Sequence, residues 1–176
     1  MSNYYNKPDM VVYTDGSCHG NGQRNATGGY GTYWGPNDSR NTSAPLTGSR
    51  QTNQRAELTA IREAVSQANE SARHYGGGRP TVVVKTDSQY GIDSLTKYHH
   101  TWNRNGWQTQ SGAPVANQDL IRGTLNDIRG GDCDVRFEHV RGHGNSAGNN
   151  AAHNLANAGA RSNNGGGGRR GGGRRY

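Results

Sequence analysis

The sequence has 176 residues, enough for one domain with short tails, and a formal net charge of +7. Such a basic balance favours a polyanionic partner, with nucleic acid before an anionic membrane surface. No apolar run approaches the length of a membrane span, and the polar start Met1–Asp9 has no secretory signal, so we expect an intracellular protein, in the cytoplasm or nucleus.

The first half of the chain predicts three strands and then a helix. The strands are expected over Met10–Asp15, Gly28–Trp34 and Asn41–Leu46, and the helix over Asn53–Ala68, with Asn53 as its N-cap. A run of three valines makes Thr81–Asp87 the clearest strand of the chain. Ser88 would cap a helix that reaches about Tyr98.

The second half predicts a loop over 99–116 and then four more segments. These are a helix over Asn117–Arg129, a strand over Asp134–Val140, a glycine-rich loop over Arg141–Gly148 and a helix over Asn149–Ala160. The order of elements predicts an α/β fold, a mixed five-stranded sheet with flanking helices. We expect one domain over 10–161, a disordered N-terminal segment over 1–9 and a disordered Gly/Arg-rich tail over 162–176.

Acidic side chains stand where two predicted strands leave the sheet. Asp15 ends the first strand and Asp87 ends the valine-rich strand. If the two strands are parallel neighbours, their carboxylates lie close together, and Glu57 in the first turns of the predicted helix could join them. Oxygen ligands of this kind suit Mg²⁺. The alternative, that each aspartate only forms a turn or caps a helix, stays open.

Five segments in this order resemble cellular ribonuclease H of type 1: Val11–Ser17, Arg50–Leu58, Thr86–Ser88, His139–His143 and Gly148–Ala152. The resemblance covers roughly residues 10–160 and implies the sheet order 3-2-1-4-5. It also implies an endoribonuclease that hydrolyses the RNA strand of RNA–DNA hybrids with two Mg²⁺ ions. The expected products carry 5′-phosphate and 3′-hydroxyl ends.

The same resemblance implies roles for individual residues. Asp15, Glu57 and Asp87 would bind the metal ions, and His143 would assist proton transfer or product release. The resemblance also implies three sets of substrate contacts. The minor groove of the hybrid would be contacted by Asn21, Asn53 and Gln54, and a phosphate of the DNA strand by Arg50, Thr52 and Asn117. The channel for the DNA strand would be formed by the aromatic residues Tyr98 and Trp102. We expect Trp107 to be a core residue instead.

One position departs from the family pattern. Where the family has a fourth acid in the last helix, this chain has His153, so one carboxylate ligand becomes an imidazole. Imidazole suits Mn²⁺ better than Mg²⁺. We therefore expect His153 to remain a metal ligand, with weaker Mg²⁺ binding, retained activity and a shift toward Mn²⁺.

Two other interpretations stay open. The chain could be a ribonuclease H-fold binder of hybrid or RNA whose metal site decayed at His153, or a domain from a virus or retroelement. The tail offers a further contact with RNA or single strands through Arg169, Arg170, Arg174 and Arg175. We expect a monomer.

Overall fold

The computed structural model describes residues 7–142 and 146–163. Its strands are β1 (Met10–His19), β2 (Thr27–Tyr33), β3 (Thr42–Pro45), β4 (Thr81–Thr86) and β5 (Asp134–His139). Its helices are α1 (Asn53–Arg73), α2 (Gln89–Asp93), the π-helical turn η1 (Ser94–Tyr98), α3 (His99–Asn105), α4 (Gln118–Arg129) and α5 (Ala147–Ser162). The tail arginines and His143 lie outside the described residues.

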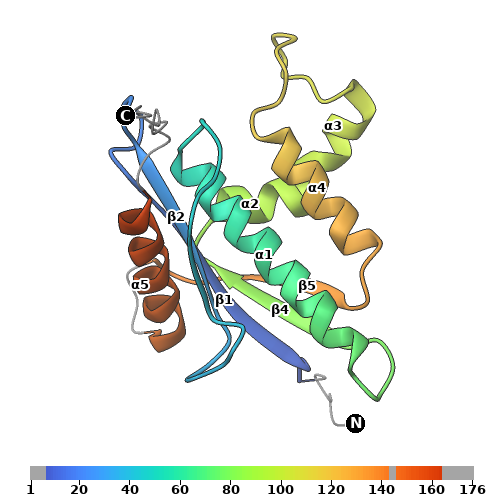
Figure 1. Cartoon of the computed structure of the whole chain (residues 1–176). Coiled ribbons are helices and arrows are strands. Elements are labelled where there is room, and N and C mark those ends of the chain that lie inside the picture. The colour runs from blue at the N-terminus through green and yellow to red at the C-terminus, as the bar shows by residue number, and fades with distance from the viewer. Residues whose placement is uncertain (1–6, 143–145, 164–176) are drawn as a thin grey trace, which may run out of the picture.

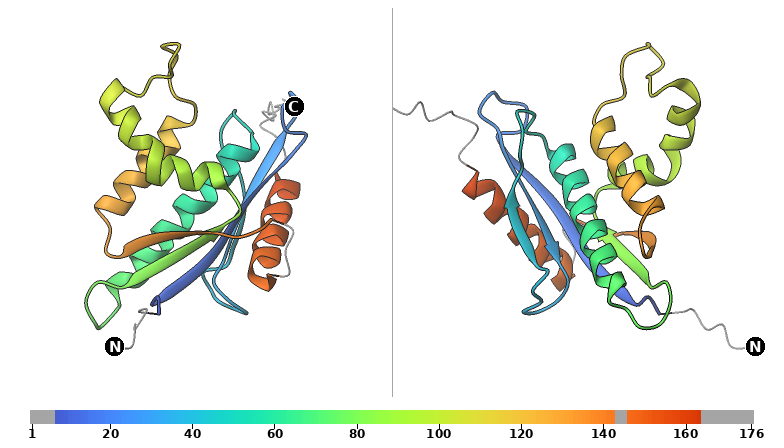
Figure 2. Two further views of the ribbon diagram at one scale, coloured as in Figure 1. Left: turned by 180° about the vertical axis from the view of Figure 1, so that it is seen from behind. Right: turned by 45° about the vertical axis from the view of Figure 1, so that its right-hand side comes forward.

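The strands form one mixed sheet in the order β3-β2-β1-β4-β5, which confirms the predicted fold. The first three strands pair as an antiparallel meander, whereas β1, β4 and β5 are parallel. Helix α1 covers one face of the sheet and α5 covers the other, while α2 to α4 extend beside α1 (Figure 1). The two further views in Figure 2 show the same layers, with the α3 and α4 region standing away from α5.

The main core lies between the sheet and α1. Val12, Val82 and Val84 point from β1 and β4 toward Leu58 and Ile61 of α1, and each of these side chains is fully buried. Their alternation along the strands and their helical spacing along α1 explain why these segments take these conformations. No described helix is long and apolar enough to cross a bilayer.

Three sequence expectations are wrong in detail. Strand β1 does not end at Asp15 but continues to His19, because its second half still pairs with β2 after the pairing with β4 has ended. The N-cap of α1 is Thr52 rather than Asn53, because the Thr52 hydroxyl accepts a hydrogen bond from the Arg55 amide at 3.2 Å. Residues 99–105, expected to be a loop, form α3. The helix continues there because Leu95, His99 and Trp102 keep a helical spacing that faces the core.

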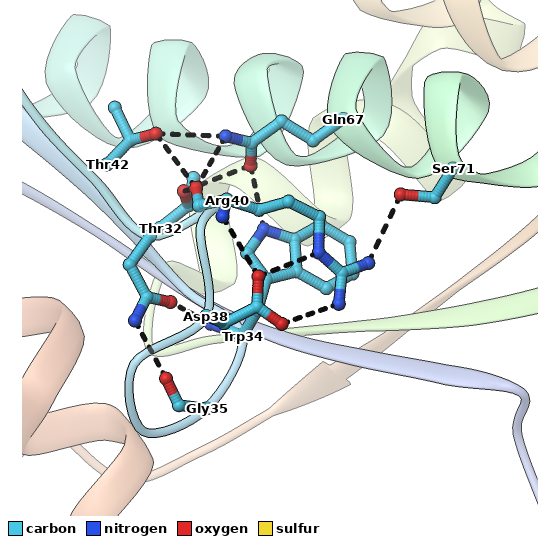
Figure 3. A network of polar contacts seen from close by, with 9 residues as sticks. Thr32, Trp34, Gly35, Asp38, Arg40, Thr42, Gln67 and Ser71 are labelled. Carbon is cyan, nitrogen blue, oxygen red and sulfur yellow. Dashed lines mark hydrogen bonds and ion pairs between the residues drawn. The ribbon is translucent and has the colours of Figure 1, made fainter.

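A polar network ties the β2–β3 hairpin to α1 (Figure 3). The Gln67 side chain accepts a hydrogen bond from Trp34 Nε1 at 2.8 Å and donates one to Thr42 Oγ1 at 2.9 Å. Arg40 lies over the Trp34 ring, 4.0 Å from its centroid, and bonds to Asp38. The hairpin is therefore held by side chains as well as by its short backbone ladder.

Helix α5 approaches the sheet so closely that β2 has room only for glycine. A Cβ atom on Gly29 would lie 2.0 Å from the Ala160 backbone nitrogen, and one on Gly31 would lie 2.7 Å from the Ala152 carbonyl oxygen. On the helix side, Ala152, Ala156 and Ala160 are fully buried. This contact sets the position of α5 and so of His153.

We expect Gly29→Ala to lower the free energy of unfolding by about 3 kcal/mol, because rigid backbone on both sides leaves no space for a methyl group. Urea denaturation measures the effect. Gly76→Ala is the matched control, since a Cβ there meets nothing within 4 Å, and it should change stability by less than about 0.5 kcal/mol. Equal stability of the two variants would contradict the close contact between α5 and β2.

Candidate active site

The parallel pairing of β1 and β4 brings two acidic residues together. Thr14 pairs with Thr86, so Asp15 and Asp87 follow at the same level of neighbouring strands. Adjacent strands lie about 4.8 Å apart. The expectation that these strands are parallel neighbours is therefore confirmed. Asp15 is buried, with 5% of its surface exposed.

Glu57 reaches the same region from the second turn of α1. The helix backbone lies directly over β1 at Gly16, where a Cβ would come within 2.2 Å of the Glu57 nitrogen. Glu57 Oε2 accepts a hydrogen bond from Ser88 Oγ at 2.7 Å, and Ser88 is the residue after Asp87. Gly16 thus allows α1 to place its carboxylate beside the strand ends.

The acids influence one another electrostatically. Burial, followed by the charge of Asp87, raises the pKa of Asp15 to about 6. Burial also raises the pKa of Glu57, and the charges of Asp87 and Asp15 contribute. Raised pKa values in neighbouring carboxylates show negative charge that the protein does not compensate fully. A cation in this position would remove that cost.

His153 supplies part of the missing compensation. Its Nδ1 lies 2.8 Å from Asp15 Oδ2, and this contact partly offsets the rise in the pKa of Asp15. The histidine side chain is 54% exposed, whereas that of Asp15 is 6% exposed. The other ring nitrogen, Nε2, lies 3.0 Å from Asn157 Nδ2. Helix α5 therefore brings the fourth expected site residue to the acids.

In the described part of the chain, no three or more His, Cys, Asp or Glu side chains are already arranged so that they could hold a metal ion. Two oxygens of these acids accept hydrogen bonds from neighbouring protein groups. Asp15 Oδ1 accepts from the Gly16 amide, and Glu57 Oε2 accepts from the Ser88 hydroxyl. The donor set nevertheless suits a hard cation, since it consists of carboxylate oxygens that lie close together at one edge of the sheet. The residues therefore fit a Mg²⁺ or Mn²⁺ site in chemistry.

The expected minor-groove residues lie next to one another. Asn21 Oδ1, in the β1–β2 connection, accepts a hydrogen bond from the Asn53 backbone amide at 3.1 Å. Asn117 Nδ2 lies 3.5 Å from Gln54 Oε1 and donates to the Tyr90 hydroxyl at 3.0 Å. The start of α1 is thus flanked by amide side chains on both sides.

The expected phosphate pocket contains an acid that sequence reasoning missed. Arg50 is an exposed residue 3.7 Å from Asp119, and Thr52 uses its hydroxyl as the α1 cap. Arg55 binds the same Asp119 through both terminal nitrogens, at 3.0 and 2.8 Å. In the sequence, the position of Asp119 in the first turn of a predicted helix indicates a favourable interaction with the helix N-terminus and does not predict its contacts with Arg50 and Arg55.

We expect Asp119→Asn to lower the free energy of unfolding at pH 7 by less than about 1 kcal/mol, because the Asp119 side chain is 52% exposed and solvent screens its charge. Hydrogen bonds from Arg55 lower the pKa of Asp119 to about 2, against about 3.9 when unfolded. The stabilisation is therefore complete above pH 4 and is lost as the pH falls toward 2. Urea denaturation at pH 7, 4 and 3 should show the difference from wild type shrinking; a difference that grows at low pH would contradict this account.

The aromatic residues separate into an exposed and a buried group. Tyr98 is 48% exposed and its ring centroid lies 5.7 Å from that of Trp102, which packs against the core edge. Trp107 is only 6% exposed, which confirms its expected core role. Tyr98 is thus exposed and Trp102 is partly buried against the core, and their role in a channel for the DNA strand stays a prediction.

A mixed sheet in the order 3-2-1-4-5, with acids on its two central parallel strands and on the adjoining helix, defines the ribonuclease H-like class. A family model described as RNase H matches residues 7–161. The chain therefore belongs to the RNase H family, and its relatives place it with the type 1 enzymes.

Ribonuclease H1 of Rattus norvegicus is 38% identical over 157 residues, which cover 89% of this chain and 52% of the rat protein. The chain thus spans about half the length of the mammalian relatives it matches. Ribonuclease HI of Neisseria meningitidis serogroup B is 36% identical over 153 residues, covering 86% of this chain and 94% of that protein. The crystal structure of LC9-RNase H1, a type 1 RNase H with the type 2 active-site motif, is 32% identical with a TM-score of 0.66, covering 90% of this chain and 75% of that one.

Proposed function

We propose that this chain hydrolyses the RNA strand of RNA–DNA hybrids with divalent metal ions, leaving 5′-phosphate and 3′-hydroxyl ends. The observation that carries the proposal is the meeting of Asp15, Glu57 and Asp87 at one edge of the sheet, where burial and then the neighbouring negative charges raise the pKa values of Asp15 and Glu57. Family membership supports the same reaction class.

Asp15, Glu57 and Asp87 would hold two Mg²⁺ or Mn²⁺ ions, with His153 as a fourth ligand beside Asp15. When bound, such ions activate the attacking water and stabilise the leaving 3′ oxygen. The protein's own part is to keep the carboxylates ionised and oriented: Ser88 fixes one oxygen of Glu57, and the Gly16 amide fixes one oxygen of Asp15. His143 would then transfer a proton near the scissile bond.

Substrate recognition follows from the surfaces beside the acids. Asn21, Asn53 and Gln54 would contact the minor groove, where the 2′-hydroxyl distinguishes RNA from DNA. Arg50, Thr52 and Asn117 would hold a phosphate of the DNA strand, which must draw Arg50 away from Asp119. Tyr98 and Trp102 would line the path of the DNA strand.

The test uses labelled RNA–DNA hybrid, single-stranded RNA and duplex RNA, each with Mg²⁺, Mn²⁺ or EDTA. We expect cleavage of the RNA strand in the hybrid only, stopped by EDTA and by Asp87→Asn. Cleavage of all three substrates, or cleavage that persists in EDTA, would overturn the proposal.

One observation favours a second function: the fourth acid of the family pattern is His153 here, which leaves one carboxylate fewer for the metal ions. A ribonuclease H-fold protein with a decayed metal site would bind hybrid without cutting it. Gel-shift binding of hybrid, with no cleavage in Mg²⁺ or Mn²⁺, would establish this function in place of the first. The virus or retroelement origin stays an open alternative, and the monomeric state and the location inside the cell stay predictions.

We also propose that the Arg/Gly tail adds a loose contact with nucleic acid through Arg169, Arg170, Arg174 and Arg175. Deleting residues 165–176 should raise KM and weaken its dependence on salt, because fewer counterions are released on binding. Steady-state kinetics at several salt concentrations measure both quantities. A KM equal to that of the full chain at every salt concentration would argue against the contact.

A further inference from the structure

A closed chain of four polar side chains links β1 to α5. Ser17 Oγ donates a hydrogen bond to Asn157 Oδ1 at 2.6 Å. Asn157 Nδ2 lies 3.0 Å from His153 Nε2, and His153 Nδ1 lies 2.8 Å from Asp15 Oδ2. Both ring nitrogens of His153 thus have a partner, one in the acid cluster and one outside it.

The spacing along the two elements explains why the chain closes. Asp15 and Ser17 are two residues apart on β1, so their side chains leave the same face of the strand. His153 and Asn157 are one turn apart on α5, so they lie one above the other on the helix. The close packing of α5 against Gly29 and Gly31 brings the two pairs together.

The second tie matters because His153 is largely exposed, at 54% of its side-chain surface. An exposed imidazole held by one hydrogen bond can rotate away from its partner at small cost. Asn157 prevents this because it holds Nε2, and Ser17 in turn holds the Asn157 amide. The ring is then kept with Nδ1 facing Asp15.

In the hydrogen-bond arrangement of the structure, the same residues favour one tautomer of His153. With Asn157 Nδ2 donating to Nε2, that nitrogen carries no proton, and Nδ1–H donates to Asp15. The amide could also be turned, so that its oxygen accepts from Nε2–H, because the Ser17 hydroxyl can accept as well as donate. In that arrangement the Nδ1 lone pair is free for a cation, as a metal-binding histidine requires.

We propose that Asn157, supported by Ser17, is a positioning residue of the metal site that acts through His153. The inference rests on the proposed function, because it assigns Asn157 and Ser17 to that same site. Neither residue needs to touch the metal ions. A partner that orients a ligand in this way typically contributes about 10- to 100-fold in metal affinity.

The first test is made without metal. Nitrogen NMR of the His153 ring in wild type should show a protonated Nδ1 and a bare Nε2. Asn157→Ala should move Nε2 toward the protonated shift, because the donor that favours the bare state is gone. Asn154→Ala is the matched control, an exposed asparagine on the same helix, and should leave the spectrum of wild type unchanged. A wild-type spectrum with Nε2 protonated and unaffected by Asn157→Ala would overturn the tautomer assignment.

The second test measures Mn²⁺ affinity by titration calorimetry without nucleic acid. We expect Asn157→Ala to weaken Mn²⁺ binding about tenfold, Ser17→Ala to weaken it less, and Asn154→Ala to have no effect. In a His153→Ala background, Asn157→Ala should have no further effect, because its only route to the metal is gone. An equal loss in both backgrounds, or no loss in either, would overturn the proposal. Tight Mn²⁺ binding without hybrid cleavage would instead count against the proposed function alone.

Discussion

The Asp15→Asn variant should lose hybrid cleavage and yet be more stable than wild type in the absence of metal. Activity should fall by more than about a hundredfold. Residues that only hydrogen-bond to metal ligands already contribute about 10- to 100-fold to metal affinity or activity, and Asp15 is itself an expected ligand. Stability should rise because the substitution removes a buried charge that faces Asp87. A buried carboxylate of this kind lowers the stability of the fold, and a bound cation would restore that stability.

The size and pH dependence of the gain follow from the pKa of Asp15, which is raised to about 6 in the folded protein. The unfolded value is about 3.9, so the shift corresponds to an upper limit of roughly 3 kcal/mol at pH 7. We expect a gain of about 1–2 kcal/mol, since the folded protein can relax around the charge. The penalty of the raised pKa is fully present above pH 6 and disappears as the pH falls below 4, so the gain should shrink between pH 7 and pH 4.

Urea denaturation with and without Mg²⁺ separates this explanation from a general effect of charge. Mg²⁺ should stabilise the wild type by mass action and leave Asp15→Asn nearly unchanged. Glu70→Gln removes the same charge from an exposed site on α1 and should keep both activity and the Mg²⁺ response. An Asp15→Asn protein that is less stable than wild type at pH 7 would contradict the expected cost of the buried Asp15 charge.

The sequence predicted that Asp15 and Asp87 meet only on the condition that their two strands are parallel neighbours, which the structure confirms. Each strand carries its own apolar pattern, and parallel pairing then places Asp15 and Asp87 directly after the last paired residues of β1 and β4. Glu57 could be added from the helix start alone. The family resemblance supplied the strand order 3-2-1-4-5, which periodicity does not determine.

What the sequence could not give are contacts between distant segments. The reason for glycine at Gly29 is the backbone of Ala160, more than a hundred residues later in the chain. The hydrogen bond between Ser17 and Asn157 spans 140 residues, and neither residue carries a signal of its own. Helix α3 was missed for a related reason: its polar composition hides the few core-facing side chains that stabilise it.

His153→Asp restores the fourth acid of the family pattern and should raise Mg²⁺-dependent cleavage of hybrid about tenfold, equal to about 1.4 kcal/mol in the barrier. Carboxylate oxygen suits Mg²⁺ better than imidazole nitrogen does, so the ratio of Mn²⁺- to Mg²⁺-dependent activity should fall. The measurement is kcat/KM for labelled hybrid in each metal. His153→Asn is the matched control, since it places a similar oxygen there without the charge and should give no gain.

The same substitution should lower the stability of the metal-free protein. This second measurement tests whether position 153 lies close enough to Asp15 for their charges to interact. His153 now sits against Asp15 at 2.8 Å and opposes the rise in its pKa, so an aspartate would remove a partner and add a charge. We expect a loss of about 1–2 kcal/mol at pH 7 without metal, recovered on adding Mg²⁺. If His153→Asp gained neither Mg²⁺-dependent activity nor Mg²⁺-dependent stability, His153 would not occupy a ligand position, and its role would be confined to its contact with Asp15.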